Sequence, residues 1–266
     1  MLVLTGLYIS QVIDETIETR DPNRHYLVSL GDSVASGAGL SGNTERGPKG
    51  CDATEAAYPL KLAKLLGAQI EQFACSGATV AQTEKNTNDL QLQLVSAQSF
   101  IKGNYVVITA GANDTSWLGF LSSCTTGNCA TDENRAMIAQ NLLALQTDYS
   151  AFLTQLKREG PSAIVVNTYY KFLNAGDTCA VDAGISEDEI GFINQQADAL
   201  NAAIANAANK NQIPVVNVDF TGHMICDKDS WLQGVSDLAP LHPTAAGQQY
   251  IAEQDAQAFK QLLKKQ

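Results

Sequence analysis

Basic residues are scarce in this chain of 266 residues. It has 17 Lys and Arg against 28 Asp and Glu, which gives a formal net charge of -11 at pH 7. A protein with this charge repels polyanions, which argues against nucleic acid as a partner and against docking on anionic membranes through a basic patch. Neutral lipids and carbohydrates stay open as substrates.

Long hydrophobic runs are also missing. The apolar stretch Leu2 to Ile9 is short, lacks a basic segment before it and leads into the acidic stretch Asp14 to Glu18, so it matches a signal peptide poorly. No run of about 18 apolar residues occurs elsewhere, which excludes a membrane-spanning helix. We therefore expect no transmembrane segment.

The sequence has no CxxC pair, so a metal ribbon or a thioredoxin-like redox site is not expected. Its six cysteines are even in number, and three disulfides formed in an oxidising compartment are the simplest interpretation. Only Cys124 and Cys129 are close enough in sequence to suggest a local pair. We infer from the cysteines that the protein is secreted.

Short β-rich runs alternate with helical patterns along the chain, as expected for a parallel sheet covered by helices on both faces. The predicted strands are Tyr26 to Leu30, Gln69 to Ala74, Tyr105 to Ala110, Ala163 to Thr168 and Val215 to Asp219. The predicted helices are Thr54 to Leu66, Asn88 to Ile101, Thr131 to Lys157, Ser186 to Asn209 and Thr244 to Lys264, with Thr244 as the cap of the last. We predict a three-layer α/β/α sandwich around a parallel sheet of about five strands.

The chain has neither a linker rich in Pro or Ser nor a repeat at solenoid spacing. We therefore predict one domain at residues 25–266, preceded by an N-terminal extension at residues 1–24. We expect it to be a monomer.

Three loops that follow predicted strands carry residues suited to acyl transfer. They contain Gly31-Asp32-Ser33, Cys75 to Thr79 and Gly111 to Asp114. Ligands bind beyond the carboxyl ends of parallel strands, so we expect these loops to meet at one edge of the sheet. A serine needs a base to take its proton, and His242, just before the last predicted helix, has the best position among three histidines.

Taken together, these segments resemble the SGNH hydrolases, also called GDSL esterases and lipases, over residues 26 to about 260. Ser33, Gly77, Asn113 and His242 match the four blocks of that family in order. The resemblance implies a flavodoxin-like fold, with Ser33 as nucleophile and His242 as general base. It also implies an oxyanion hole made by the N–H groups of Ser33 and Gly77 and the side-chain amide of Asn113.

The chain departs from the family pattern beside His242. Most members have an aspartate three residues before the histidine, where this chain has Ala239. One branch, typified by cysteine-rich secreted Streptomyces esterases and phospholipases, uses a backbone carbonyl there instead. On that resemblance we expect the Ala239 carbonyl to orient His242, with the Asp237 carboxylate as the alternative if its loop folds back past Pro240.

The same branch implies three sequential disulfides, which here are Cys51–Cys75, Cys124–Cys129 and Cys179–Cys226. It also has a Gly-His-x-x-Cys segment that resembles Gly222 to Cys226. His223 in this segment is a candidate metal ligand or second base, but no Asp, Glu or Cys cluster at ligand spacing surrounds it, so we expect a structural role. We expect neither a metal nor a cofactor.

Other residues near the four blocks have structural alternatives. Asp32 and Asp114 are candidate general acids, yet acids beside glycine turns more often bond backbone N–H groups, so we leave both out of the chemistry. Asn113 begins a formal N-glycosylation sequon, and a glycan there would refute its catalytic assignment. The insert from Trp117 to Asn134 is expected to shape specificity. Aromatic and apolar residues that either line a pocket or simply pack are Trp117, Phe120, Leu121, Tyr169, Tyr170 and Phe172.

The sequence predicts a secreted carboxylic ester hydrolase that forms an acyl-serine intermediate. Its substrate is a small-molecule, lipid or acylated-carbohydrate ester. Two alternatives remain: a noncatalytic carbohydrate- or lipid-binding protein on the same fold, and an acyltransferase, which shares the acyl-enzyme and differs only in the acceptor.

Overall fold

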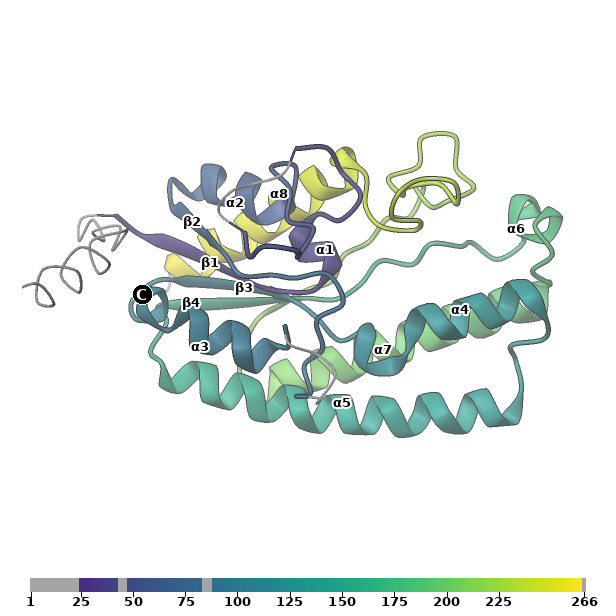
Figure 1. Ribbon diagram of the computed structural model, residues 1–266, viewed down its shortest axis with the longest axis horizontal. Helices are drawn as coiled ribbons and strands as arrows, with labels where there is room; N and C mark the ends of the chain where they lie inside the picture. The colour runs from purple at the N-terminus through teal and green to yellow at the C-terminus, as the bar shows by residue number, and fades with distance from the viewer. Residues whose placement is uncertain (1–23, 43–46, 83–87, 265–266) are drawn as a thin grey trace, which may run out of the picture.

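The computed structural model describes residues 24–42, 47–82 and 88–264 (Figure 1). The expected N-terminal extension lies outside the described residues, apart from Arg24. At the centre is a sheet of five parallel strands in the order β2-β1-β3-β4-β5. The strands are β1 Tyr26–Gly31, β2 Gln69–Gln72, β3 Tyr105–Thr109, β4 Ala163–Asn167 and β5 Val215–Val216.

Helices cover both faces of this sheet (Figure 1). Helices α2 (Tyr58–Leu66) and α8 (Ala245–Leu263) lie on one face. Helices α3 (Leu90–Ile101), α5 (Asp132–Arg158) and α7 (Glu187–Lys210) lie on the other. The predicted three-layer α/β/α sandwich is thereby confirmed.

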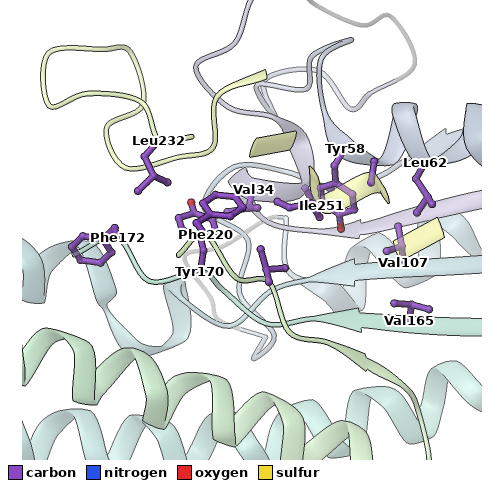
Figure 2. Close-up of a cluster of buried hydrophobic side chains, with 14 of the residues drawn as sticks. Val34, Tyr58, Leu62, Val107, Val165, Tyr170, Phe172, Phe220, Leu232 and Ile251 are labelled. Carbon is purple, nitrogen blue, oxygen red and sulfur yellow. The ribbon is translucent and has the colours of Figure 1, made fainter. Parts of the chain in front are cut away.

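Each face of the sheet has its own buried apolar cluster, because successive strand residues point to opposite sides. Val107 of β3 packs in the cluster that contains Tyr58 of α2 and Ile251 of α8 (Figure 2). Its neighbour Val106 packs in the second cluster, with Leu94 of α3. Fully burying a side chain of this kind stabilises the fold by about 1.5 to 3 kcal/mol.

The three longest helices begin at residues that the sequence marks as caps. The side chains of Thr131, Ser186 and Thr244 accept N–H groups in the first turns of α5, α7 and α8. Glu189 also bonds back to the Ser186 N–H and completes a capping box. The Thr244 cap, two residues after His242, fixes the start of α8 at Ala245.

Some predicted boundaries are wrong. Helix α2 begins at Tyr58 and not at Thr54, because the Thr54 N–H bonds the Ser36 carbonyl at 2.9 Å. Strand β5 ends at Val216 and not at Asp219, because it pairs with β4 over only two residues. Three short helices were not predicted: α1 (Ser33–Ser36), α4 (Trp117–Thr126) and α6 (Thr178–Asp182).

All six cysteines form disulfides, and the pairs are those that the resemblance implies: Cys51–Cys75, Cys124–Cys129 and Cys179–Cys226. The first joins the loop after α1 to the segment after β2. The second closes the end of α4 near the start of α5, and the third joins α6 to the loop before α8. Within the described residues, no helix is long and apolar enough to cross a membrane.

Candidate active site

The carboxyl end of β1 leads directly into the Gly31-Asp32-Ser33 turn. Gly31 has a φ of 140°, and a Cβ at this position would lie 2.1 Å from the Thr109 carbonyl oxygen of β3, so only glycine fits. The N–H of Asp32 bonds the same carbonyl at 2.9 Å. Strands β1 and β3 therefore fix the point at which the turn leaves the sheet.

Ser33 is the first residue of α1. The Asp32 carboxylate caps this helix by accepting the Val34 N–H at 3.0 Å. The first N–H groups of a helix have no acceptor within it, so the Ser33 N–H is a donor at the start of α1. The Ser33 side chain is half-buried and lines a cavity beyond the carboxyl ends of the strands.

His242 lies directly against Ser33. Its Nε2 is 2.7 Å from the Ser33 Oγ, and its Nδ1 is 3.1 Å from the Pro240 carbonyl oxygen. Because a carbonyl only accepts hydrogen bonds, Nδ1 carries the ring hydrogen and Nε2 accepts the serine hydroxyl hydrogen. Burial lowers the pKa of His242 below its usual 6.5, and bonds to the Pro240 and Ala239 carbonyls partly offset that effect. The imidazole is therefore neutral at neutral pH.

The Nδ1 hydrogen bond goes to the Pro240 carbonyl, one residue after the Ala239 carbonyl that the resemblance implies. The Ala239 carbonyl accepts the backbone N–H of His242 at 3.2 Å, and the Nδ1 hydrogen bond goes to Pro240. Between them Leu241 has a φ of 64°, in the left-handed region. This turn brings the imidazole back toward the carbonyls that precede it: Nδ1 bonds the Pro240 carbonyl, and both the Pro240 and the Ala239 carbonyls act to raise the pKa of the imidazole.

Asp237, the alternative acid, is engaged elsewhere. Its carboxylate accepts the Gly234 N–H at 2.6 Å, and its own N–H bonds the Gly234 carbonyl at 3.0 Å, so both groups close one turn. The residue is exposed to solvent. Over the described part of the chain, no hydrogen bond or ion pair joins Asp237 to His242.

The loops after β2 and β3 hold the other two predicted residues. Asn113 begins a short 3-10 turn, η1 (Asn113–Thr115), and its Nδ2 donates to the Ala78 carbonyl at 2.8 Å. A side-chain amide has two hydrogens, so this bond fixes Asn113 and leaves a second donor. Asn113 lines the same cavity as Ser33 and His242, whereas the exposed Gly77 does not.

The two aspartates that we left out of the chemistry both bond backbone N–H groups. Asp114 accepts the N–H groups of Val80 and Ala81 at 3.0 and 2.9 Å, which joins the loops after β2 and β3. Asp32 accepts the N–H of Val34, as described above. Burial raises the pKa of Asp114 to about 6 and that of Asp32 to about 7.

Apolar side chains surround the reacting groups, and α4, which lies in the predicted insert, supplies one wall. Trp117 of this helix contacts Phe172 edge-on, with 6.5 Å between ring centroids. The apolar and aromatic lining consists of Val34, Ala112, Trp117, Leu118, Leu121, Tyr169, Tyr170, Phe172, Pro240 and Leu241. The chain therefore brings an apolar cavity to the Ser33–His242 pair.

Two tyrosines after β4 have contacts that the sequence did not indicate. The Tyr169 hydroxyl donates to the Asp32 carboxylate, and the Tyr170 hydroxyl donates to the Leu241 carbonyl at 2.9 Å. We considered both only as pocket walls or packing residues. Their position just beyond the carboxyl end of a buried strand is the one available signal.

The other histidines are held by different contacts. His25 stacks on Tyr105, and His223 stacks on Trp231 with 3.7 Å between ring centroids. His223 Nδ1 also lies 2.8 Å from the Asp229 carbonyl oxygen. Within the described ranges, no group of three or more His, Cys, Asp or Glu side chains is arranged to hold a metal ion.

Comparison with known proteins finds a matching family and a similar lipase. Residues 29–250 match the model of the GDSL-like lipase/acylhydrolase family, a range that includes Ser33, Gly77, Asn113 and His242. The chain is 33% identical to a lipase of Streptomyces rimosus over 234 residues, which is 83% of this chain and 81% of that protein.

Two solved structures are also similar. A phospholipase A1 from Streptomyces albidoflavus has a TM-score of 0.74 at 27% identity, over 89% of this chain and 99% of its own. An extracellular lipase from Streptomyces rimosus has a TM-score of 0.72 at 27% identity, over 88% of this chain and 98% of its own.

Proposed function

The chain belongs to the GDSL-like lipase/acylhydrolase family and is an ester hydrolase, and we propose that Ser33 and His242 carry out its reaction as a two-residue catalytic unit. The observation that carries this proposal is the 2.7 Å contact between Ser33 Oγ and His242 Nε2. An imidazole in this position, neutral and with Nδ1 protonated, is the base that a serine hydroxyl needs.

The reaction has two halves. As Ser33 Oγ attacks the ester carbonyl carbon, His242 Nε2 takes its proton, and the Pro240 carbonyl keeps the imidazolium oriented through Nδ1–H. The tetrahedral intermediate expels the alcohol, which takes the proton from Nε2 and leaves an acyl-serine. A water molecule activated by His242 then attacks the acyl group, releasing the acid and restoring Ser33.

The negative charge on the tetrahedral oxygen needs donors that are in place before the reaction. We assign this role to the N–H groups of Ser33 and Gly77 and to the side-chain amide of Asn113. The Ser33 N–H at the start of α1 and the fixed Asn113 amide, both at the cavity, support the assignment. Loss of one such donor typically slows catalysis by about 10²- to 10³-fold.

An ester with an apolar acyl chain fits the cavity better than an acetyl ester does. Trp117, Leu118 and Leu121 line one wall of the cavity, and we infer that an acyl chain longer than acetyl packs against them. Each buried methylene group contributes about 0.8 kcal/mol, so a longer chain gains binding energy there. The lipase and phospholipase A1 relatives support a lipid ester over an acetylated polysaccharide.

The proposed enzyme is secreted and monomeric, with residues 25–266 as its catalytic unit. Three disulfides support an oxidising compartment, and a similar Streptomyces rimosus lipase is extracellular. The α/β/α sandwich that contains all five strands supports a single unit.

A panel of esters tests this proposal. It includes p-nitrophenyl esters from acetate to palmitate, phosphatidylcholine and acetylated xylan, each assayed with wild type and with Ser33→Ala. We expect kcat/KM to rise with acyl chain length and to fall by roughly a million-fold in Ser33→Ala. Undiminished hydrolysis by Ser33→Ala would refute the nucleophile, and activity confined to acetylated xylan would refute the apolar acyl group.

A further inference from the structure

The loop that carries His242 needs support from outside itself. A hydrogen bond within the loop orients the imidazole, but contacts with other elements must hold the loop near Ser33. Here the partner of Nδ1 is the Pro240 carbonyl, only two residues away on the same loop. A bond this local moves with the loop, so it cannot fix where the imidazole lies relative to Ser33.

Tyr170 supplies a bond from another element. Its hydroxyl donates to the carbonyl of Leu241, the residue directly before His242, at 2.9 Å. The Tyr170 ring is buried and stacks on Phe220 with 4.4 Å between centroids, which leaves the hydroxyl little freedom (Figure 2). The histidine loop is thus tied to the segment after β4.

Tyr169 makes the corresponding bonds on the other side of the site. Its hydroxyl donates to the Asp32 carboxylate and accepts the Ala112 N–H at 3.2 Å. Asp32 precedes Ser33 and Ala112 precedes Asn113, so one hydroxyl joins the nucleophile turn to the asparagine loop. The Asn201 side chain bonds the N–H and the carbonyl of Tyr169 at 2.8 and 2.7 Å and holds it against α7.

We propose that Tyr169 and Tyr170 are positioning residues whose hydroxyls hold the Ser33, Asn113 and His242 loops in register, an inference that rests on the proposed function of these loops. Consecutive residues of an extended chain point to opposite sides, so adjacent tyrosines reach different loops. Tyr170 acts on His242 through the backbone, because its hydroxyl fixes the carbonyl of the residue directly before the histidine.

Removal of each hydroxyl alone tests the proposal. The variants are Tyr169→Phe and Tyr170→Phe, with Tyr149→Phe as the matched control. Tyr149 is fully buried in the core, and its hydroxyl has no hydrogen-bond partner among the described residues. The control therefore removes a buried tyrosine hydroxyl that holds no loop.

We expect kcat per active site to fall about 10- to 100-fold in Tyr169→Phe and Tyr170→Phe, with KM nearly unchanged, because displacement of reacting groups by about an ångström has effects of this size. Tyr149→Phe should match wild type. Active sites are counted by fluorophosphonate titration, so a smaller folded fraction does not imitate a lower kcat.

Two further readouts separate positioning from general stability. If Tyr169 acts through the asparagine loop, Tyr169→Phe should lower kcat by a much smaller factor in an Asn113→Ala background than in wild type. In Tyr170→Phe, weaker contact between Nδ1 and the Pro240 carbonyl should lower the pKa of His242 and move the acid limb of kcat/KM to lower pH. The other titratable groups lining the cavity are Asp32, Tyr169 and Tyr170 itself.

The outcomes are distinct. Wild-type kcat in both tyrosine variants, or an equal loss in Tyr149→Phe, would overturn the positioning role. Additive effects of Tyr169→Phe and Asn113→Ala would overturn the action of Tyr169 through the asparagine loop. Failure of wild-type protein to react with the fluorophosphonate would instead count against the proposed function itself.

Discussion

At the scale of single residues, the contacts of Asp237 decide whether the site is a Ser33–His242 dyad or a triad with an aspartate. Its carboxylate bonds the Gly234 N–H and not the imidazole. We therefore expect Asp237→Ala to change kcat/KM by less than about threefold, as is usual for exposed positions. Steady-state kinetics on a p-nitrophenyl ester measures this, and a loss of about 10⁴-fold would identify Asp237 as a catalytic acid after all.

The protonation of His242 sets the acid side of the pH profile. Burial lowers its pKa below 6.5. The ring accepts the Ser33 proton only when neutral, so activity is lost as pH falls through this pKa. We therefore expect kcat/KM to reach half its maximum below pH 6.5. A midpoint above pH 7 would mean that a negative charge stabilises the imidazolium.

The sequence was sufficient to bring Ser33, Asn113 and His242 to one cavity, because each follows or precedes a recognisable element. It could not select the carbonyl that meets Nδ1. That choice depends on the φ of 64° at Leu241, a conformation that leucine rarely adopts and that no residue type in the loop signals. The hydrogen bonds of the Tyr169 and Tyr170 hydroxyls could not be predicted either, because they join segments far apart in the chain.

At the scale of elements, helix α4 forms the cavity wall at which we propose that the acyl chain binds. It carries Trp117 and Leu118, and the Cys124–Cys129 disulfide holds its far end near α5. Removing the bridge with Cys124→Ala and Cys129→Ala should cost about 2 kcal/mol of stability and loosen this wall.

We expect the double cysteine variant to show a severalfold higher KM for p-nitrophenyl palmitate and little change for the acetate ester. The acetate ester serves as the internal control, because its acyl group is too short to need the α4 wall. Equal changes for both esters would show that α4 does not bind the acyl chain.

Element prediction succeeded where local signals were strong. Thr244 caps α8 as expected, and Thr131 and Ser186, the first residues of two predicted helices, cap α5 and α7, because capping depends on residues close in sequence. Helices α1, α4 and α6 were not predicted, because they are short and their apolar residues show little helical periodicity. Strand β5 is cut short at Val216 because pairing with β4, and not β propensity, determines its length.

At the scale of the whole molecule, a buried carboxyl links stability to pH. Asp255 of α8 is fully buried, and within the described residues its carboxyl accepts one hydrogen bond, from the amide of Asn167 at 3.0 Å. Burial raises its pKa from 3.8 to about 8. The folded protein thus holds this proton more tightly than the unfolded chain does, so stability declines as pH rises from 3.8 toward 8.

We expect Asp255→Asn to flatten this decline and to stabilise the protein at pH 8 relative to wild type, by an amount on the order of a few kcal/mol. Urea unfolding at pH 5 and pH 8 measures it. Glu253→Gln, an exposed change on the same helix, is the matched control and should leave the slope unchanged. An unchanged slope in Asp255→Asn would show that the carboxyl is ionised in the folded protein and would contradict its raised pKa.

The three disulfides also act on the whole molecule. Each native bridge in a secreted domain typically contributes about 2 to 5 kcal/mol. Reduction should therefore lower Tm by about 10 °C or more, as measured by calorimetry with and without reductant. An unchanged Tm under reducing conditions would contradict the disulfide-stabilised, secreted protein that we propose.

Covalent labelling tests the central claim, the Ser33–His242 pair, most directly. A fluorophosphonate should react with the folded protein at one site, and mass spectrometry should locate the adduct on Ser33. His242→Ala should slow the labelling by several orders of magnitude while the protein stays folded, because no other base contacts the Ser33 Oγ in the described residues. An adduct on another serine, or labelling of His242→Ala at the wild-type rate, would contradict the account.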